Sequence, residues 1–424
     1  MDVELLKRII SDEESEIRQK FENENIVERE YQPEIERHLT RPNAIILSGV
    51  RRSGKSTSAV LITRGEKSAR INFDHPSLEG MKSSDLIKLN EAISELKGNV
   101  KFVILDEVQN IEGWELFVSR LRETNIVIVT GSNSELMSEE LASRLTGRYV
   151  SFTTFPFSFR EYLKYLNFSP NVYEVSDRAR TRLHFDSYVR TGGFPEAISF
   201  GERFLAQIYS DILTKDIERR FGIRNRATFR EFSRYILSNV SKEISFNKLK
   251  NVFDLKSVHT VSNYLSFLEK AFLVFVINKY SDKLKEQVRG RKKVYSIDTG
   301  MAIALGFRPT EDRGRLLENI VALQLIRRKH YFDTRLEIYY WKDYAGNEVD
   351  FVLKEGASIT QLIQVSYNID DTDTKKREVD SLLTCSDNLK CENLLVLTND
   401  YEDTENFEGK SIRFIPIWKW SLGD

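Results

Sequence analysis

Residues 49–57 read "GVRRSGKST" and match the phosphate-binding pattern G-x-x-x-x-G-K-[ST], with Gly49, Gly54, Lys55 and Ser56 in place. The apolar run "AIILS" precedes this stretch, and a helical pattern follows it. That strand–loop–helix context is the one in which the pattern binds phosphate. We therefore predict a phosphate-binding loop rather than a glycine-rich turn that matches by chance.

The residue types of this loop explain how it would hold a nucleotide. Glycine lets backbone N–H groups turn towards phosphate oxygens without a Cβ clash, and the helix N-terminus adds a partial positive charge. Lys55 would reach the β- and γ-phosphates, and the Ser56 hydroxyl would bind Mg²⁺. For Arg51 and Arg52, simple ion pairing is the favoured role. We expect ATP or ADP to contact the whole segment: Gly49, Val50, Arg51, Arg52, Ser53, Gly54, Lys55, Ser56 and Thr57.

An acidic motif ends a second apolar run, "KFVILDEVQ" at residues 101–109. Asp106 would hold the magnesium, usually through water, and Glu107 would orient and deprotonate the attacking water. A solvated strand end is the alternative, and the phosphate loop upstream argues against it. Another strand pattern, "ARINF" at residues 69–73, lies between the two motifs. That insertion indicates the NTPase branch with a catalytic glutamate rather than the kinase branch.

The run "IVIVTGSNS", residues 126–134, predicts a further buried strand with a polar end. Thr130, Ser132 or Asn133 would there sense the γ-phosphate or position the water, and we select Asn133 as the catalytic candidate. An ordinary turn at the end of the strand is the alternative.

The segment "SRLTGRYVSF", residues 143–152, offers Arg144 and Arg148 as an arginine finger. A planar guanidinium suits phosphate oxygens, and we select Arg148 as the candidate. The sequence leaves open whether either arginine acts in cis, acts in trans or only forms a salt bridge.

The chain resembles the prokaryotic, mainly archaeal, AAA+-type ATPases that carry a C-terminal domain of largely unknown function. The resemblance covers nearly the whole chain, and five segments in the right order carry it: "GVRRSGKST", "LDEVQNIEGWE", "TGSNSELMSEELASRLTGR", "PFSFREYL" and "RTGGFPEA". The resemblance implies an ATP-binding core, a helical lid and a C-terminal module related to restriction-endonuclease folds. It supplies no settled biological role.

The chain has 424 residues, which is too long for one ordinary core, and continuous β-branched runs alternate with helical patterns. We expect an α/β multidomain protein whose core is the parallel sheet of a P-loop NTPase. The expected division is a helical arm (1–40), an AAA+-type ATPase core (41–155), a helical lid (156–225), a winged-helix domain (226–305) and a PD-(D/E)xK-like α/β module (306–424).

Composition excludes several classes of protein. Lys and Arg number 63 against 64 Asp and Glu, so a nucleic-acid site would be a local basic patch. The N-terminus is acidic where a signal peptide is basic, and no apolar run approaches the roughly 20 residues that span a bilayer. The only cysteines, Cys385 and Cys391, suggest neither a disulfide framework nor a zinc site. We expect a cytoplasmic protein with no membrane partner.

Residues 226–300 show winged-helix features: three helical patterns, a strand, a basic loop and a strand. The third helix, "SVHTVSNYLSFLEKA", has Ser257 as a credible N-cap. One face of this helix is apolar (Val258, Val261, Leu265 and Leu268), and the other is the candidate recognition face (His259, Thr260, Asn263 and Lys270).

The loop at residues 281–293 is rich in basic residues: Lys283, Lys285, Arg289, Arg291, Lys292 and Lys293. A basic loop between two strands is what a wing that grips phosphates requires, so we predict DNA as a partner through the winged helix. Packing of the wing on another domain is the alternative.

The C-terminal segment carries acids in the order of a PD-(D/E)xK nuclease: Glu318 on a helix, then Asp350 on a strand. The next strand reads "LIQVSYN", with Gln364 and Ser366 where the nuclease has its second acid and its lysine. Such a site needs both charges, because the metal activates water and the lysine steadies the developing charge. We predict a module kept for packing or DNA binding, with rescue by Lys354 as the competing possibility.

Together these features predict a Mg²⁺-dependent ATPase that couples nucleotide state to domain rearrangement, on DNA. The alternatives are a nucleotide-controlled signalling or scaffold switch with little turnover, and an ATP-gated nuclease. An oligomer is compatible with the sequence, which specifies neither the pathway nor the DNA structure.

Overall fold

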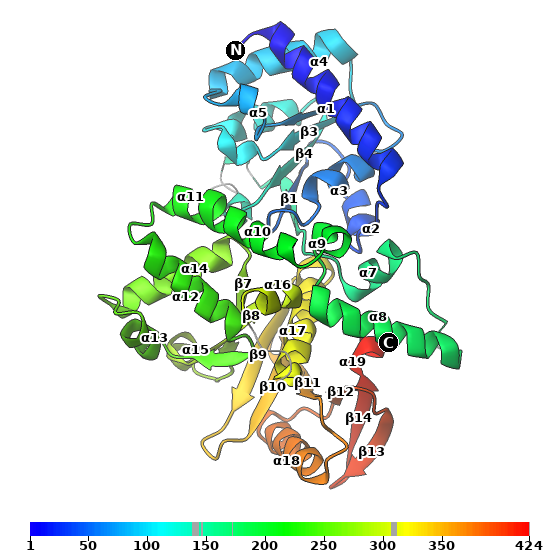
Figure 1. Cartoon of the computed structure of the whole chain (residues 1–424), viewed down its shortest axis with the longest axis vertical. Coiled ribbons are helices and arrows are strands. Elements are labelled where there is room, and N and C mark those ends of the chain that lie inside the picture. The colour runs from blue at the N-terminus through cyan, green and yellow to red at the C-terminus, as the bar shows by residue number, and fades with distance from the viewer. Residues whose placement is uncertain (138–143, 146, 172, 307–311, 424) are drawn as a thin grey trace. The chain divides into compact units, whose positions relative to one another are not determined.

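A computed structural model of the whole chain describes residues 1–137, 144–145, 147–171, 173–306 and 312–423 (Figure 1). The chain divides into two compact units, Met1–Phe155 and Pro156–Asp424. The first is called the N-terminal unit below, and the second the C-terminal unit.

The described part of the N-terminal unit contains a five-stranded parallel sheet in the order β2-β3-β4-β1-β5. The strands are β1 (Ala44–Ser48), β2 (Ser68–Asn72), β3 (Phe102–Asp106), β4 (Ile126–Gly131) and β5 (Tyr149–Thr153). The first four confirm the strands predicted from apolar runs. Because all strands are parallel, the loops after β1, β3 and β4 leave the same edge of the sheet.

The helices of this unit are α1 (Val3–Asn23), α2 (Gln32–Glu36), α3 (Lys55–Ile62), α4 (Leu86–Lys97) and α5 (Trp114–Leu121). Short 3₁₀ turns connect them at Pro76–Leu78, Ser83–Asp85, Val108–Asn110 and Ser134–Met137. Helix α1 buries Leu6, Ile9 and Ile10 in the same core as α4 and the central strands. The predicted helical arm is therefore packed on the sheet.

The C-terminal unit begins with helices, in agreement with the helical pattern of its sequence. They are α7 (Phe159–Tyr165), α8 (Val175–Thr191), α9 (Pro195–Phe200), α10 (Arg203–Asp211), a π-helical turn (Ile212–Glu218) and α11 (Arg219–Phe221). Helix α7 starts at a capping box, in which Ser158 Oγ accepts from Glu161 N at 3.2 Å and Glu161 Oε2 accepts from Ser158 N at 3.0 Å.

The next elements are α12 (Arg226–Ser238), β6 (Lys242–Ile244), α13 (Phe246–Val252), α14 (Val258–Lys270), β7 (Val274–Lys279), α15 (Leu284–Arg289), β8 (Lys292–Ser296) and α16 (Thr299–Ala304). Ser257 caps α14 as predicted, because its Oγ accepts from Thr260 N. The apolar face is buried except at Val258, which is 38% exposed because it lies in the first turn. The prediction of one continuous basic loop is wrong, since α15 and the start of β8 fall within it.

The remaining elements are α17 (Arg313–Tyr331), β9 (Leu336–Lys342), β10 (Glu348–Glu355), β11 (Ser358–Ser366), α18 (Thr372–Leu389), β12 (Leu394–Thr398), β13 (Asp403–Phe407), β14 (Lys410–Pro416) and α19 (Ile417–Trp420). Within the described residues, the strands of this unit form one nine-stranded sheet in the order β13-β14-β12-β11-β10-β9-β7-β8-β6. Strands β7 and β9 join its two parts, with Asn278 opposite Tyr339. The segments predicted as winged helix and C-terminal module thus share a sheet. In the described part of the chain, none of the helices combines the length and apolarity that crossing a membrane requires.

Candidate functional site

The loop after β1 is shaped by two glycines in the left-handed region, Gly49 with φ 143° and Gly54 with φ 93°. At Gly49 the chain also passes close to its neighbour, because a Cβ there would lie 2.2 Å from the carbonyl oxygen of Thr154. Gly54 leads directly into α3, where the free N–H groups of the first turn suit an anion. The loop therefore has the strand–loop–helix geometry that the sequence predicts.

Lys55 lies folded into its own loop. Its Nζ donates to the carbonyl oxygens of Gly49 and Val50, each at 3.1 Å, and lies 3.8 Å from Glu107 Oε1. The side chain is only 4% exposed, so its charge is directed inwards. The ammonium thus lies between the phosphate loop and the acidic motif.

The two predicted motifs meet at Ser56 and Asp106. Ser56 Oγ donates to Asp106 Oδ1 at 2.8 Å, and Thr130 Oγ1 donates to the same oxygen. A hydroxyl and a carboxylate side by side fit Mg²⁺, which binds through one or two such oxygens together with substrate phosphates. The loop also holds Ser53 Oγ, which is buried and has no hydrogen-bond partner among the described residues. The residues present fit a nucleotide with its metal ion.

Glu107 begins the turn after β3 in the left-handed conformation, with φ 53°. Its backbone N–H donates to Thr130 Oγ1 at 3.2 Å, and its carboxylate accepts from Gln109 Nε2. Burial raises the pKa of Glu107, while Lys55 acts to lower it. A buried carboxylate with a raised pKa is suited to accept a proton.

The other predicted loop residues have varied surroundings. Arg51 pairs with Asp74 at 3.2 Å, which agrees with the ion-pairing role favoured for it. Arg52 is exposed and has a positive φ of 64°. Val50 is fully buried, and Thr57 Oγ1 accepts from Lys20 Nζ of α1 at 3.0 Å.

Among the polar residues after β4, Thr130 is the one that contacts Asp106 directly. Ser132 and Asn133 are also buried at this edge of the sheet. The catalytic assignment of Asn133 stays a prediction.

The position of Arg148 excludes its action as an arginine finger within its own chain. Its carbonyl oxygen accepts from Ala44 N at 3.1 Å, and Ala44 starts β1. The phosphate loop leaves the other end of this strand, about 13 Å further along, which is beyond the reach of an arginine side chain. Arg148 is half exposed and lies 3.9 Å from Glu123, while Arg144 lies 3.3 Å from Glu115. A role for Arg148 in trans stays a prediction.

Sequence reasoning missed Arg70, which comes from β2. Arg70 Nη1 donates to Glu13 Oε2 of α1 at 3.0 Å, and Nη2 donates to Asp106 Oδ2. Burial raises the pKa of Glu13 to about 7, although Arg70 acts to lower it. Arg70 thus connects α1 to Asp106, the predicted ligand of the metal ion. An arginine within the apolar run "ARINF" was the available signal.

Replacing Arg70 with methionine is expected to lower the free energy of unfolding by about 3 kcal/mol, because two buried carboxylates lose their cation. Urea denaturation measures this change. The matched control is Arg51→Met, which breaks a more exposed pair with Asp74 and is expected to cost less than about 1 kcal/mol. Equal losses in the two variants would contradict the role given to Arg70.

The segment between α1 and α2 contacts the phosphate loop and the start of α3. Arg29 Nη1 donates to the carbonyl oxygen of Ser53 at 2.8 Å, and Arg29 Nη2 donates to that of Phe155. The Tyr31 hydroxyl contacts Ser58 Oγ at 3.0 Å and Thr154 Oγ1 at 2.9 Å. The sequence carried no signal for these contacts, because they join segments far apart in the chain.

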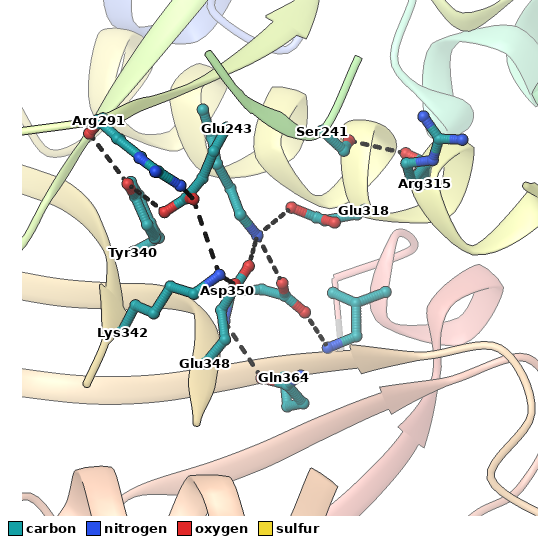
Figure 2. Close-up of polar contacts among 12 residues, drawn as sticks. Ser241, Glu243, Arg291, Arg315, Glu318, Tyr340, Lys342, Glu348, Asp350 and Gln364 are labelled. Atoms are coloured by element: carbon teal, nitrogen blue, oxygen red, sulfur yellow. Dashed lines mark hydrogen bonds and ion pairs between the residues drawn. The ribbon is translucent and has the colours of Figure 1, made fainter. Parts of the chain in front are cut away.

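In the C-terminal unit, the two acids predicted to resemble a nuclease site, Glu318 and Asp350, are buried and lie with Glu348 in one cluster. Lys293 Nζ of β8 lies 2.9 Å from Glu318 Oε1, 2.7 Å from Glu348 Oε1 and 2.9 Å from Asp350 Oδ1. Figure 2 shows Glu318, Glu348 and Asp350 reaching this point from a helix and a strand. We call these three acids and Lys293 the carboxylate cluster.

Lys293 and Lys354 lie in surroundings that the sequence did not indicate. Lys293 was expected on an exposed wing, but it is 2% exposed because the alternation of β8 turns it towards the acids. Lys354 was the competing possibility for a lysine that acts beside Asp350. It pairs instead with Glu337 at 3.3 Å, and the register of β10 against β11 shifts between Leu353 and Lys354.

The members of the cluster shift one another's pKa values. Burial acts to lower the pKa of Lys293, but Asp350, Glu318 and Glu348 raise it well above its usual range. Burial and the nearby Asp350 raise the pKa of Glu318 to about 8. Burial acts to raise the pKa of Glu348, yet Lys293 and Lys342 hold it below its usual value. The lysine therefore stays charged and bound to its acids.

Family models cover most of the chain. An AAA domain matches residues 41–163, a domain of unknown function (DUF8612) matches residues 182–311, and another (DUF4143) matches residues 313–420. The uncharacterized protein MJ1544 of Methanocaldococcus jannaschii is 31% identical over 403 residues, which is 90% of this chain and 89% of the relative. This chain belongs to the same family. Its residues 41–163 match an AAA domain, which supports a P-loop ATPase family of the AAA type.

Other similarities are consistent with this family but add no function. An uncharacterized protein of Haemophilus influenzae is 31% identical over 88% of this chain and 93% of its own length. Among solved structures, the Walker-type ATPase of Pyrococcus abyssi has a TM-score of 0.42 and 15% identity, covering 66% of this chain and 96% of that chain. The Aeropyrum pernix ORC1 protein in complex with DNA has a TM-score of 0.30 and 15% identity, covering 68% and 95%. Both structural scores are too low to support an inference.

Proposed function

We propose that the N-terminal unit binds ATP with Mg²⁺ and hydrolyses it. The observation that carries this proposal is the contact of Ser56 Oγ with Asp106 Oδ1 at 2.8 Å, with Lys55 and Glu107 beside it. These residues come from the loops after β1 and β3, which leave the same edge of one sheet with β4 between them, and the family model supports an ATPase domain.

In this proposal each side chain has one task. Lys55 and the N–H groups of the loop bind the phosphates, and Ser56 and Asp106 hold the ion, which offsets phosphate charge when it is bound. Glu107 orients the attacking water and takes its proton, and Thr130 fixes Asp106 and the Glu107 backbone. Asn133 is a further candidate for placing the water.

The purified chain should release phosphate from ATP in a Mg²⁺-dependent reaction, measured with and without linear, circular and branched DNA. Stimulation by one DNA form would support the coupling of turnover to DNA. Nucleotide binding without turnover under any condition would contradict hydrolysis and favour the alternative, a nucleotide-controlled scaffold switch.

We further propose that residues 226–305 form a winged helix that contacts DNA. The order of helices and strands from α12 to β8 supports this, as does the antiparallel pairing of β8 with both β6 and β7. The exposed basic groups are Lys283 and Lys285 near α15 and Arg291, which bonds to Glu243 at 3.1 Å. Lys292 donates to Asn278, and the side chain of Arg289 is outside the described part of the chain.

Replacing Lys283 and Lys285 together with glutamine is expected to weaken binding to every DNA sequence and to lower the salt slope of log K by about 2, because two phosphate contacts are lost. Fluorescence anisotropy across a salt series measures the slope. The matched control replaces Lys376 and Lys390, which are exposed on and after α18. If both pairs change the slope equally, the contact is not at the wing.

For the C-terminal module, the order α17, β9, β10, β11, α18, β12 supports a PD-(D/E)xK-like fold. We propose that it does not cleave DNA, since Gln364 and Ser366 stand where a nuclease has charges. The alternative is an ATP-gated nuclease, which a DNA cleavage assay would support if it detects cleavage and exclude if the DNA stays intact. The five-part division of the chain and a cytoplasmic location also stay predictions from the sequence.

A further inference from the structure

The carboxylate cluster is built like a cation site, but a side chain fills it. Three carboxylate oxygens surround Lys293 Nζ at 2.7 to 2.9 Å. Carboxylates from a helix and a strand, gathered around one point, are the hard oxygen ligands that Mg²⁺, Mn²⁺ and Ca²⁺ prefer. Within the described residues, no group of three or more acids, histidines or cysteines is open to a metal ion. At this cluster the Lys293 ammonium occupies the space between the oxygens.

The three acids are held by other groups besides Lys293. Glu318 Oε1 accepts from the Tyr295 hydroxyl at 2.8 Å, Glu348 Oε2 accepts from Lys342 Nζ at 2.7 Å, and Asp350 Oδ2 accepts from Val365 N at 3.0 Å. Figure 2 shows Lys342 beside Glu348. Removal of the lysine therefore leaves a preformed set of oxygens rather than three free side chains.

The neighbouring strand reinforces the arrangement. Gln364 Oε1 accepts from Asp350 N at 3.2 Å, and Gln364 Nε2 donates to Glu378. The amide thus connects β10 to α18, and Figure 2 places it on the Asp350 side of the cluster. Its carbonyl is already used by the backbone of β10.

We propose that the Lys293 ammonium permanently takes the place of a divalent metal ion between Glu318, Glu348 and Asp350. As a result the cluster is a metal-free clasp that ties β8 to α17 and β10. An ammonium neutralises carboxylates but does not activate water as a divalent ion does. This inference concerns the C-terminal unit alone and does not depend on ATP hydrolysis.

Lys293→Ala should convert the clasp into a metal site. Without Lys293, the buried Glu318 and Asp350 lose their cation and the partly buried Glu348 keeps only Lys342, which is unfavourable, and a divalent ion would replace the lost charge. Equilibrium dialysis with Mn²⁺, on the nucleotide-free full chain, should show a gain of about one ion per chain over the wild type. The gain should vanish when Asp350→Asn is added. Lys292→Ala removes the neighbouring lysine of β8, which donates to Asn278 of β7, and should bind no additional ion.

Three results would overturn the proposal. One is a wild-type protein that binds Mn²⁺ in a way that Asp350→Asn abolishes. The second is a Lys293→Ala protein that folds but shows no Mn²⁺ binding that Asp350→Asn abolishes. The third is failure of both Lys293→Ala and Lys293→Met to fold at any Mn²⁺ concentration, since the ion would then be unable to replace the ammonium. Refolding of either variant by Mn²⁺, through Asp350, supports it.

A cleavage assay on the wild type provides a separate readout. Linear, circular and branched DNA should remain intact in Mg²⁺ and in Mn²⁺, with and without ATP. Cleavage that disappears in Asp350→Ala, but survives Lys55→Ala when ATP is absent, would show that metal reaches the cluster. That result would reject the clasp while leaving the ATPase proposal untouched.

Discussion

Replacing Glu107 with glutamine is expected to lower ATP turnover by about 100-fold or more while nucleotide affinity stays nearly unchanged. Glutamine keeps the shape of the side chain, and Ser56, Asp106 and Lys55 remain to hold the nucleotide. The lost function is proton transfer from water. General-base catalysis of this kind typically raises the rate by about 10²- to 10⁴-fold. Phosphate release gives kcat, and fluorescence of a labelled nucleotide gives the dissociation constant.

Glu112→Gln provides the control, since this acid lies five residues further along the chain and is exposed. Its turnover should equal that of the wild type. If Glu107→Gln also hydrolyses ATP at the wild-type rate, Glu107 is not the base. A loss of both affinity and turnover would instead assign this carboxylate to binding.

Lys55→Ala is expected to weaken nucleotide binding by about 10- to 100-fold. A hydrogen bond to a charged group contributes about 1.5 to 3 kcal/mol, and each 1.4 kcal/mol is tenfold in affinity. The buried position of Lys55, in contact with Gly49 and Val50, directs this charge at the loop rather than at solvent. Titration of the labelled nucleotide measures the loss.

Lys67→Ala removes an exposed lysine of the same unit and should leave the affinity unchanged. Because Lys55 also lies 3.8 Å from Glu107, circular dichroism must show that the variant keeps its fold. A folded Lys55→Ala protein with wild-type affinity would move the nucleotide site away from this loop.

Local pattern was sufficient for the core of the N-terminal unit. Buried parallel strands are continuous apolar runs, so β1, β2, β3 and β4 were recognisable, and the meeting of Ser56 with Asp106 followed from their parallel order. Strand β5 was not predicted, because "YVSFT" carries polar residues and its first three positions are only partly buried. Without β5 in place, nothing revealed that Arg148 lies at the far end of the sheet.

Side chains that act across large separations escaped prediction. Lys293 reads as part of a basic run, and only the packing of β8 beside α17 and β10 shows that it faces three acids. Arg70 likewise meets Glu13 and Asp106 through contacts between α1, β2 and β3. A charged residue in a sequence is expected to lie at the solvent-exposed surface. Only the folded structure shows that Lys293 and Arg70 are instead buried or partly buried beside acids.

The close approach at Gly49 limits which residues of this loop can be replaced in a relative that has lost ATP turnover. A relative that no longer turns over nucleotide has no chemical reason to keep Lys55 or Glu107. It would still need glycine at this position, because a methyl group would collide with the Thr154 carbonyl 2.2 Å away. As long as β1 and β5 lie side by side, that collision persists whether or not ATP is bound. In such a lineage, the first glycine of the loop would outlast the residues that made the loop useful.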